Sequence, residues 1–405
     1  MSRIVLGVAG GIAAYKACLL LRLFTEAGHD VHVVPTANAL SFVGETTWAA
    51  LSGNVVHTSV FADTHEVPHV RLGREADLVV VAPATADLLA RAASGRADDL
   101  LSSVLLTASC PVVMAPAMHT EMWLHPATQA NVATLRSRGV VVLRPAEGRL
   151  TGVDSGPGRL PEPGDIEASA LACLDGREAA ARMAAQDLAG QKVVVSAGGT
   201  REALDPVRFV GNSSSGLMGV ALARAAVQRG ADVTLVAANL AVEPPAAVTV
   251  VPVVSTSDLA AAMDAHAPNA DLVVMAAAPA DFTPASPSGT KLKKSGDSGL
   301  VVEFTQTTDV LAGLAARRPD GQVVVGFAAE TAADEAELLR LGTDKLARKG
   351  CQLLALNDVS GGAVFGAPDN RVLLLGASGL LGRAAGSKTS VAHAIVDAAQ
   401  SLRER

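Results

Sequence analysis

The sequence predicts two doubly wound, Rossmann-like α/β domains in series, each built on a mostly parallel sheet. Strand-like and helix-like segments alternate along the chain, which is typical of parallel strands joined by crossover helices. Several strand-like runs are apolar on both faces, as a sheet covered by helices on both sides requires. The order of these runs starts again after a polar, alanine-rich segment at residues 175–191, which we interpret as a linker helix or boundary.

The first half, residues 1–178, is expected to form a five-stranded domain. It opens with a β-run at 3–8, followed by a helix at 13–27 that Gly28 ends. The remaining strands are expected at 31–35, 76–81, 111–114 and 140–143.

The second half, residues 188–405, repeats this order and adds a sixth strand. Its strands are expected at 192–196, 231–236, 270–275, 322–326, 352–356 and 371–375. Convergence is sufficient to explain the similarity of the two halves. The stretch 282–304, rich in proline, serine, glycine and lysine, is expected to form a mobile, extended arm.

Composition excludes several classes of protein. The net charge is −7 and the only compact basic run covers residues 291–294, which argues against a nucleic-acid surface. The four cysteines show no CxxC spacing, so neither a zinc site nor a disulfide framework is indicated. No window holds 18 uninterrupted apolar residues, so no membrane span is expected. We therefore expect a soluble, cytoplasmic protein.

The loop at 196–219 is the most informative stretch. Loops between a strand and a helix usually have roughly 2–6 residues, and longer ones are usually functional. Small and hydroxylated residues precede a predicted helix at 220–228, where backbone N–H groups and the helix N-terminus favour an anion. Arg201 and Arg208 add guanidinium groups that fork onto phosphate or carboxylate oxygens. The alternative is an ordinary connection that happens to be long.

The glycine patterns favour mononucleotides over dinucleotides in both halves. Neither first turn reads GxGxxG, because one has Gly7-x-x-Gly10-Gly11 and the other has Gly198-Gly199. No acidic residue follows the second strand of the first half to hold a ribose. A dinucleotide-dependent dehydrogenase is therefore weakly supported.

Several motifs occur in one order along nearly the whole chain. They lie at 10–16 (GGIAAYK), 83–87 (PATAD), 116–118 (PAM), 197–208 (AGGTREALDPVR), 211–219 (GNSSSGLMG), 291–294, 326–331 (GFAAET) and 357–359 (NDV). With these motifs the chain resembles the bifunctional phosphopantothenoylcysteine decarboxylase/phosphopantothenate–cysteine ligase family of coenzyme A biosynthesis.

The resemblance implies that the second half is the ligase. Such enzymes activate 4′-phosphopantothenate with CTP as an acyl-cytidylate, and cysteine then displaces CMP to form an amide. Asn212 is implied to orient the acyl-phosphate, although an asparagine holding a turn is the alternative. Lys291 is implied to stabilise charge on the transferring phosphate, the alternative being a solvated charge run. Asp281 is implied to contact the nucleotide or Mg²⁺.

Further residues of the second half are implied to bind substrate. Asn357 and Asp358 are candidates for reading the cytosine edge, although a turn at the end of a strand explains them almost as well. The other implied contacts are Arg201, Arg208, Ser214, Ser215, Gly216, Ala277, Phe327 and Lys345.

The first half is implied to be the decarboxylase, with FMN as hydride acceptor. His69 is the implied general base, and His57, His65 and His119 are the competing histidines. Met118 is implied to contact the substrate. The residues implied to hold FMN are Gly10, Gly11, Thr36, Pro83, Thr85, Ser102, Ser103 and Ala117.

The chain departs from the family pattern at two places. The family usually has asparagine where this chain has His119, which also donates a hydrogen bond and is expected to act in catalysis. Family members with a flap cysteine carry it before Asp-x-Gly-Pro-Gly-Arg, whereas the flap at 150–159 has none. Water, His119 or Asp154 is then expected to relay the proton.

Two other functional classes stay open at this point. One is a flavin-binding regulatory or interaction protein of the same fold, and the other is a flavin- or nicotinamide-dependent oxidoreductase. The resemblance also implies a homo-oligomer, with decarboxylase trimers and ligase dimers that combine into larger assemblies such as a dodecamer.

Overall fold

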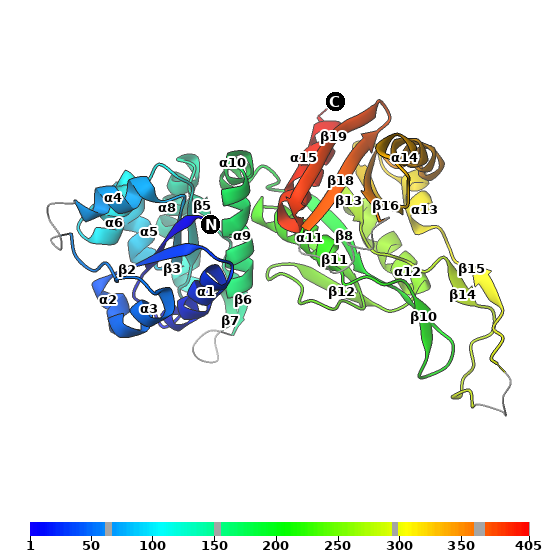
Figure 1. The fold of residues 1–405 in the computed structure, drawn as a ribbon, viewed down its shortest axis with the longest axis horizontal. Coiled ribbons are helices and arrows are strands. Elements are labelled where there is room, and N and C mark those ends of the chain that lie inside the picture. The colour runs from blue at the N-terminus through cyan, green and yellow to red at the C-terminus, as the bar shows by residue number, and fades with distance from the viewer. Residues whose placement is uncertain (61–66, 150–154, 294–298, 360–368, 405) are drawn as a thin grey trace. The chain divides into compact units, whose positions relative to one another are not determined.

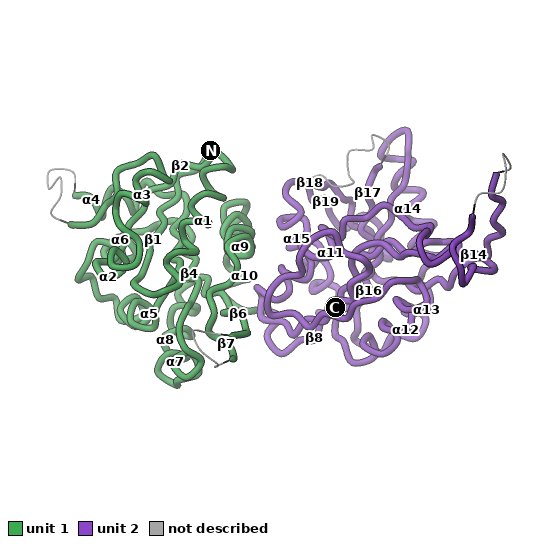
Figure 2. Tube along the Cα trace, turned by 90° about the horizontal axis from the view of Figure 1, so that it is seen from below, with its two compact units in different colours: residues 1–187 green, residues 188–405 purple. Residues whose placement is uncertain are grey.

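The computed structural model describes residues 1–60, 67–149, 155–293, 299–359 and 369–404 (Figure 1). The chain forms two compact units, Met1–Asp187 and Leu188–Arg405 (Figure 2). Helix α10, Arg177–Ala185, buries Ala180 and Met183 in the core of the first unit, so most of the segment at 175–191 belongs to that unit. None of the helices in these described ranges is long and apolar enough to cross a membrane.

The first unit contains a five-stranded parallel sheet in the order β2-β1-β3-β4-β5. This confirms the predicted α/β class, and the order is that of a flavodoxin-like doubly wound sheet. The strands are β1 Arg3–Val8, β2 Asp30–Pro35, β3 Leu78–Ala84, β4 Val112–Pro116 and β5 Val141–Val142.

Helices cover both faces of this sheet because alternate strand residues point to opposite sides. Ile4, Leu6 and Val8 of β1 pack in one core cluster, and Val5 packs in the other. The first layer consists of α1 Ala14–Glu26, α3 Glu45–Ser52, α9 Pro163–Asp175 and α10. The second layer consists of α4 Pro68–Glu75, α5 Ala86–Ser94, α6 Leu100–Thr107, α7 Thr120–Leu124 and α8 Pro126–Ser137.

Three short elements complete the first unit. Helix α2, Ala37–Leu40, follows β2, and strands β6, Ala146–Arg149, and β7, Ser155–Arg159, form an antiparallel hairpin. Trp48 on α3 and Trp123 on α7 are both buried, one in each core cluster.

An aspartate precedes the central strand of each unit. Asp77 Oδ2 accepts the N–H of Arg3 at 2.8 Å, and Asp271 Oδ2 accepts the N–H of Lys192 at 2.8 Å. Each carboxylate accepts the hydrogen bond of a backbone N–H at the start of the neighbouring strand. Without it, that N–H would have to be satisfied by water. Strands β3 and β13 therefore begin one residue after the aspartate, two residues later than the apolar pattern predicts.

The second unit contains an eight-stranded sheet in the order β12-β11-β8-β13-β16-β17-β18-β19. The first six strands of this order pair in parallel, whereas β18 and β19 are antiparallel. The strands are β8 Lys192–Gly198, β11 Asp232–Ala238, β12 Thr249–Val253, β13 Leu272–Met275, β16 Val323–Glu330, β17 Leu353–Asp358, β18 Asp369–Gly376 and β19 Gly379–Ser387.

Helices also cover both faces of the second sheet. Helices α11, Leu217–Gln228, and α15, Lys388–Arg403, pack on one face. The other face carries α12 Thr256–His266, the short 3₁₀ turn Ala267–Asn269, α13 Val310–Arg317 and α14 Glu335–Lys349.

Two small antiparallel hairpins project from the second unit (Figure 1). One pairs β9, Arg201–Ala203, with β10, Phe209–Gly211, inside the long loop that follows β8. The other pairs β14, Phe282–Pro284, with β15, Phe304–Gln306, at the base of the predicted arm.

Candidate active sites

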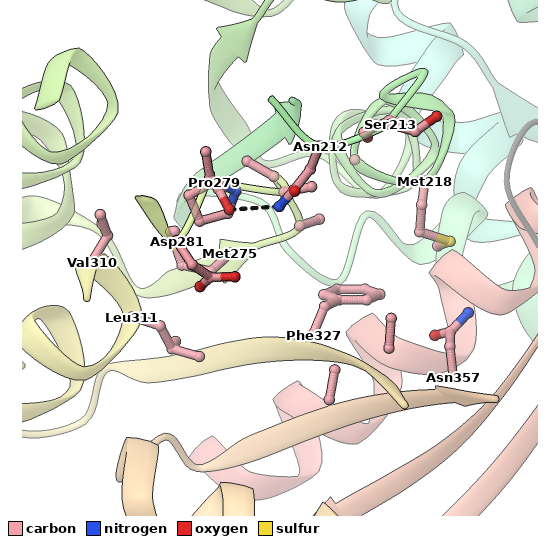
Figure 3. Close-up of a pocket in the computed structure, with 18 of the residues that line it drawn as sticks. Asn212, Ser213, Met218, Met275, Pro279, Asp281, Val310, Leu311, Phe327 and Asn357 are labelled. Carbon is pink, nitrogen blue, oxygen red and sulfur yellow. Dashed lines mark hydrogen bonds between the residues drawn. The ribbon is translucent and has the colours of Figure 1, made fainter. Parts of the chain in front are cut away.

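A cavity of about 590 Å³ lies at the carboxyl ends of the parallel strands of the second unit (Figure 3). Its walls come from the loop after β13, the ends of β16 and β17, and the first turn of α11. In open α/β sheets this edge is where ligands bind. Of the predicted ligand contacts, those that line it are Asn212, Ser214, Ser215, Gly216, Ala277, Asp281, Phe327, Lys345 and Asn357.

Asn212 joins two walls of this cavity. Its Nδ2 donates a hydrogen bond of 2.8 Å to the carbonyl oxygen of Pro279, which lies two residues before Asp281 (Figure 3). An amide group has a second N–H and a carbonyl oxygen. Asn212 therefore fixes the loop around Pro279 and keeps polar atoms for a ligand.

The segment before α11 is shaped as an anion site. Gly216 is the N-cap with φ of +82°, and a Cβ there would lie 2.4 Å from Leu240 Cδ2, so only glycine fits. The hydroxyls of Ser214 and Ser215 accept the backbone N–H groups of Gly216 and Leu217. The helix dipole and backbone donors at this end favour a negatively charged group.

A buried network behind the cavity holds the loop that presents Asp281, and the sequence pattern does not predict it. Thr200 Oγ1 accepts the N–H of Ala280 at 2.8 Å and is hydrogen-bonded to Thr256 Oγ1 at 2.9 Å. The N–H of Thr256 donates to Glu202 Oε1 at 2.8 Å. Thr200, Thr256 and Glu202 are each 5% exposed or less, so the loop rests on fixed partners.

Cationic side chains line one side of the cavity. Lys345 on α14 lies 2.7 Å from Glu330 Oε1, and Lys349, one turn later, lies 2.6 Å from Asp309 Oδ2. Burial raises the pKa of Asp309, but the hydrogen bonds from Lys349 and the Ala312 N–H, together with the charges of Lys349 and Arg348, leave that pKa below its ordinary value. Lys349 was not among the residues predicted from the sequence, although its spacing from Lys345 places both on one helix face.

Lys388 adds a cation from the first residue of α15. It lines the cavity, and its Nζ donates to the carbonyl oxygen of Asp369 at 3.2 Å. Burial lowers the pKa of Lys388, and the nearby Asp369 opposes that effect. The cavity is therefore suited to a polyanionic ligand.

Asn357 presents an unsatisfied acceptor at the end of β17. The residue is 7% exposed, and its Nδ2 donates to Asn370 Oδ1 at 2.6 Å. Its Oδ1 is buried and has no hydrogen-bond partner among the described residues. A buried acceptor without a partner costs about 1–3 kcal/mol, so a donor on a ligand would be favoured here.

The described residues contain no group of three or more His, Cys, Asp or Glu side chains arranged for a metal ion. Asp281 and Asp309 both line the cavity, and Asp309 is bonded to Lys349. Mg²⁺ is commonly held by one or two carboxylates together with substrate phosphates. Asp281 fits that arrangement when a nucleotide supplies the remaining oxygens.

Four predicted contacts do not appear among the described residues that line the cavity. Arg201 lies over the ring of Phe209 at 4.7 Å, and Lys291 is exposed on the arm. Asp358 is exposed at the end of β17. The guanidinium of Arg208 forks onto the carboxylate of Asp205 instead of facing the cavity.

In the first unit, the loops after β1, β2 and β3 meet at the carboxyl edge. A Cβ on Gly10 would lie 2.3 Å from Asn38 Cβ, so glycine permits the close approach of the loop after β2. A Cβ on Gly11 would lie 3.7 Å from Thr85 Cγ2, and the N–H of Ala9 donates to the carbonyl of Pro83 at 3.2 Å. The predicted FMN contacts in these loops are therefore brought together.

The hydroxyl groups at this edge already form hydrogen bonds in the first turns of helices. Thr36 and Thr85 accept backbone N–H groups at the starts of α2 and α5. Ser102 Oγ donates to Asp99 Oδ1 at 2.7 Å, and Ser103 Oγ donates to the carbonyl of Asp99 at 2.8 Å. The two serines thus stabilise the first turn of α6 in this structure.

The loop after β4 supports the hairpin that leads to the predicted flap. The N–H of Ala117 donates to the carbonyl of Ala84 at 3.1 Å, and the N–H of Met118 donates to the carbonyl of Gly158 at 2.9 Å. His119 is exposed at the start of α7. The predicted proton relay Asp154, within the flap at 150–159, lies outside the described residues.

His69 lies on α4 and is half-buried. Its Nδ1 is buried and has no hydrogen-bond partner in the described parts of the chain, while its carbonyl accepts from Thr107 Oγ1 at 2.7 Å. Of the competing histidines, His57 lies against His32 with ring centroids 5.7 Å apart, and His65 lies outside the described residues. A histidine that is not fully buried can exchange a proton with a ligand that reaches its ring.

Two family models match the chain. Residues 1–174 match the Flavoprotein family, and residues 188–402 match the DNA/pantothenate metabolism flavoprotein C-terminal domain. The boundary between the two matches falls close to the boundary between the two units.

The chain is also similar to curated proteins along its length. It is 56% identical over 402 residues to the coenzyme A biosynthesis bifunctional protein CoaBC of Mycolicibacterium smegmatis, covering 98% of this chain and 96% of the relative. It is 40% identical over 375 residues to the protein of that name from Bacillus subtilis, covering 92% and 89%. A crystal structure of the C-terminal domain of a CoaBC protein is 33% identical, covering 54% of this chain and 98% of that one with a TM-score of 0.45.

Proposed function

Because this chain belongs to the family of bifunctional coenzyme A biosynthesis proteins, we propose roles for its two units within that activity. The resemblance drawn from the motifs is confirmed by relatives that match almost the whole chain. The protein is a bifunctional enzyme that joins 4′-phosphopantothenate to cysteine and decarboxylates the product to 4′-phosphopantetheine. We assign decarboxylation to Met1–Asp187 and ligation to Leu188–Arg405, because the two family models divide at that point.

In the ligase unit the cavity holds CTP and the activated acid. The single observation that carries this assignment is that Lys345 and Lys349 line the same cavity as the anion site before α11. A carboxylate is a poor acyl donor until its oxygen becomes part of a good leaving group, so the site must bring several anions together. The second N–H of Asn212 orients the acyl-phosphate. Asn357 Oδ1 accepts a hydrogen bond from the amino group of cytosine. Lys291 reaches the transferring phosphate from the arm.

Magnesium travels with the nucleotide in this proposal. Asp281 supplies one carboxylate, and the nucleotide phosphates and water supply the other ligands. We expect CTP to be preferred over ATP, as the family resemblance implies, with the buried acceptor of Asn357 receiving the amino group of cytosine.

In the decarboxylase unit the converging loops around Gly10, Gly11 and Thr85 hold FMN. When bound, FMN accepts a hydride from the substrate and later returns it, which makes the loss of CO₂ possible. His69 acts as general base. Met118 and His119, in the loop after β4, contact the substrate and bind its carboxylate.

We also propose that the protein is a cytoplasmic homo-oligomer. Tyr15 and Leu19 are 57% and 51% exposed one turn apart on α1, and Val207 and Phe209 are 62% and 52% exposed in the second unit. Large apolar side chains that are exposed on the surface of a unit favour contacts between copies of the chain. All four cysteines are unpaired, in agreement with a reducing compartment.

One assay tests the proposal. The purified protein is incubated with 4′-phosphopantothenate, cysteine and CTP, and pyrophosphate and CO₂ are followed. We expect both products and 4′-phosphopantetheine. Pyrophosphate without CO₂ would remove the decarboxylase assignment, and flavin binding without either product would favour the regulatory alternative, which the two full-length matches do not support.

A further inference from the structure

The loop between β9 and β10 is bonded to the arm beside Lys291. The N–H of Ser288 donates to the carbonyl of Leu204 at 2.9 Å. The N–H of Leu292 donates to Asp205 Oδ2 at 3.1 Å, and Arg208 donates to the carbonyl oxygen of Leu292 at 2.6 Å. Both backbone polar groups of Leu292 are thus held by one acid–base pair.

The carboxylate of Asp205 is a strong anchor. Its side chain has 0% exposure, and it also accepts the N–H groups of Val207 and Arg208 at 2.8 Å each. The fork from Arg208 adds bonds of 2.9 and 2.6 Å to Oδ2. The hydrogen bond from Arg208 keeps the pKa of Asp205 far below its ordinary range, so the anchor is charged at neutral pH.

We propose that Asp205 and Arg208 are positioning residues for Lys291. Lys291 precedes Leu292 directly, and fixing both backbone groups of Leu292 restricts where the lysine side chain can reach. Without these bonds, Lys291 on a long arm would occupy many positions. Each restraint lowers the entropic cost of placing Lys291 when the substrate binds. The inference rests on the proposed role of Lys291 as the group that stabilises charge on the transferring phosphate.

The Asp205–Arg208 pair differs from a surface ion pair because it also bonds to the backbone of the arm. An exposed pair such as Arg317 and Asp264, with side chains 64% and 54% exposed, joins two helices and contributes little. The Asp205–Arg208 pair instead makes two bonds to the backbone of a segment more than eighty positions away in the chain. Loss of the Asp205–Arg208 pair should therefore change the place of Lys291, whereas loss of the exposed pair should not.

Asp205→Asn tests the inference, with Asp264→Asn as the matched control. We expect the maximal rate of CTP-dependent pyrophosphate release to fall about tenfold while KM for CTP changes less than about twofold, because Lys291 acts in the transition state. We expect Asp264→Asn to match the parent protein. Trypsin should also cleave after Lys291 and Lys293 faster in Asp205→Asn than in either reference protein.

The decisive measurement combines Asp205→Asn with Lys291→Ala. If Asp205 acts through Lys291, the double variant should be no slower than Lys291→Ala alone. Additive losses would overturn the inference and assign Asp205 a separate effect. A Lys291→Ala variant as fast as the parent would instead overturn the proposed role of Lys291.

Arg208→Lys provides a second variant if Asp205→Asn does not fold. Lysine keeps the charge but cannot donate to Asp205 and to the Leu292 carbonyl at once in the same geometry. We expect Arg208→Lys to speed trypsin cleavage after Lys291. It should lower the maximal rate of pyrophosphate release when Lys291 is present, but not in the Lys291→Ala background. Unchanged cleavage and an unchanged rate would overturn the inference.

Discussion

Lys349 Nζ lies 2.6 Å from Asp309 Oδ2, so the last turn of α14 is bonded to the N-cap of α13 at the wall of the cavity. The same ammonium group lies where a triphosphate is proposed to bind. Lys349 therefore both holds two helices together and offers a charge to the ligand.

Lys349→Gln should raise KM for CTP about tenfold or more, because a hydrogen bond to a charged group contributes about 1.5–3 kcal/mol. Steady-state pyrophosphate release measures this. Arg340→Gln, on the same helix and 63% exposed, is the control and should behave as the parent protein. Equal effects of the two variants would contradict a role for Lys349 in nucleotide binding.

Asn212→Asp should slow amide formation by about tenfold or more, since a carboxylate next to the Pro279 carbonyl and an acyl-phosphate adds repulsion. Quenched-flow measurement of the cysteine-dependent step follows the change. Asn269→Asp, exposed and outside the cavity, serves as control. CTP should remain a better activator than ATP in the parent protein, and equal use of ATP would contradict the proposed reading of cytosine.

His69→Asn should keep FMN and ligase activity but lose CO₂ release, because the base acts only after the amide exists. The Nδ1 of His29 is likewise buried without a partner among the described residues, and His29 lies at the start of β2, the opposite end from the strand-end loops. His29→Asn is therefore the matched control and should decarboxylate normally. Normal CO₂ release by His69→Asn would remove that residue from catalysis.

Replacing all four cysteines should leave 4′-phosphopantetheine as the product. Burial raises the pKa of Cys173 to about 12 and that of Cys351 to about 11, and it also raises the pKa of Cys18 and of Cys110. Thiols that are such weak acids are poor proton donors at neutral pH. Mass spectrometry decides the question: a product lighter by two hydrogen atoms in this variant alone would show that a cysteine donates the proton.

Glu162 should make the first unit sensitive to acid. Burial raises the pKa of Glu162, but hydrogen bonds and charge from Lys16 and Arg159 outweigh it and hold that pKa below the ordinary 4.5. The carboxylate therefore stabilises the fold above about pH 4.5, and this contribution is lost as the pH falls through the lower, folded value. Calorimetric melting at several pH values should show a smaller acid-induced decrease for Glu162→Gln, and an identical decrease would contradict the assignment.

The alternation of apolar runs was enough to predict both sheets, because parallel strands between helices must be apolar on both faces. It missed β12, where Pro252 lies in an edge strand, and β19, where glycines at 379, 382 and 386 weaken the strand pattern. Edge strands are half-solvated, so the apolar signal that marks a central strand is absent from them.

The site could be predicted where its residues belong to loops that follow strands, as Asn212 and Asp281 do. Contacts between segments that are distant in the chain could not be predicted. The partners of Thr200 are Thr256 and Ala280, and nothing in the local sequence pairs a threonine with either. Arg208 was expected to face a ligand because a guanidinium fits an anion, but Asp205, three residues earlier, supplies that anion within the protein.

The aromatic residues of the chain divide unevenly between its units. Both tryptophans, Trp48 and Trp123, and the single tyrosine, Tyr15, lie in the first unit. Ultraviolet fluorescence excited at the tryptophan band therefore reports on the first unit alone, and the second unit gives no tryptophan signal. A tryptophan introduced at Phe304, 40% exposed at the base of the arm, would emit in the second unit, which has no native tryptophan.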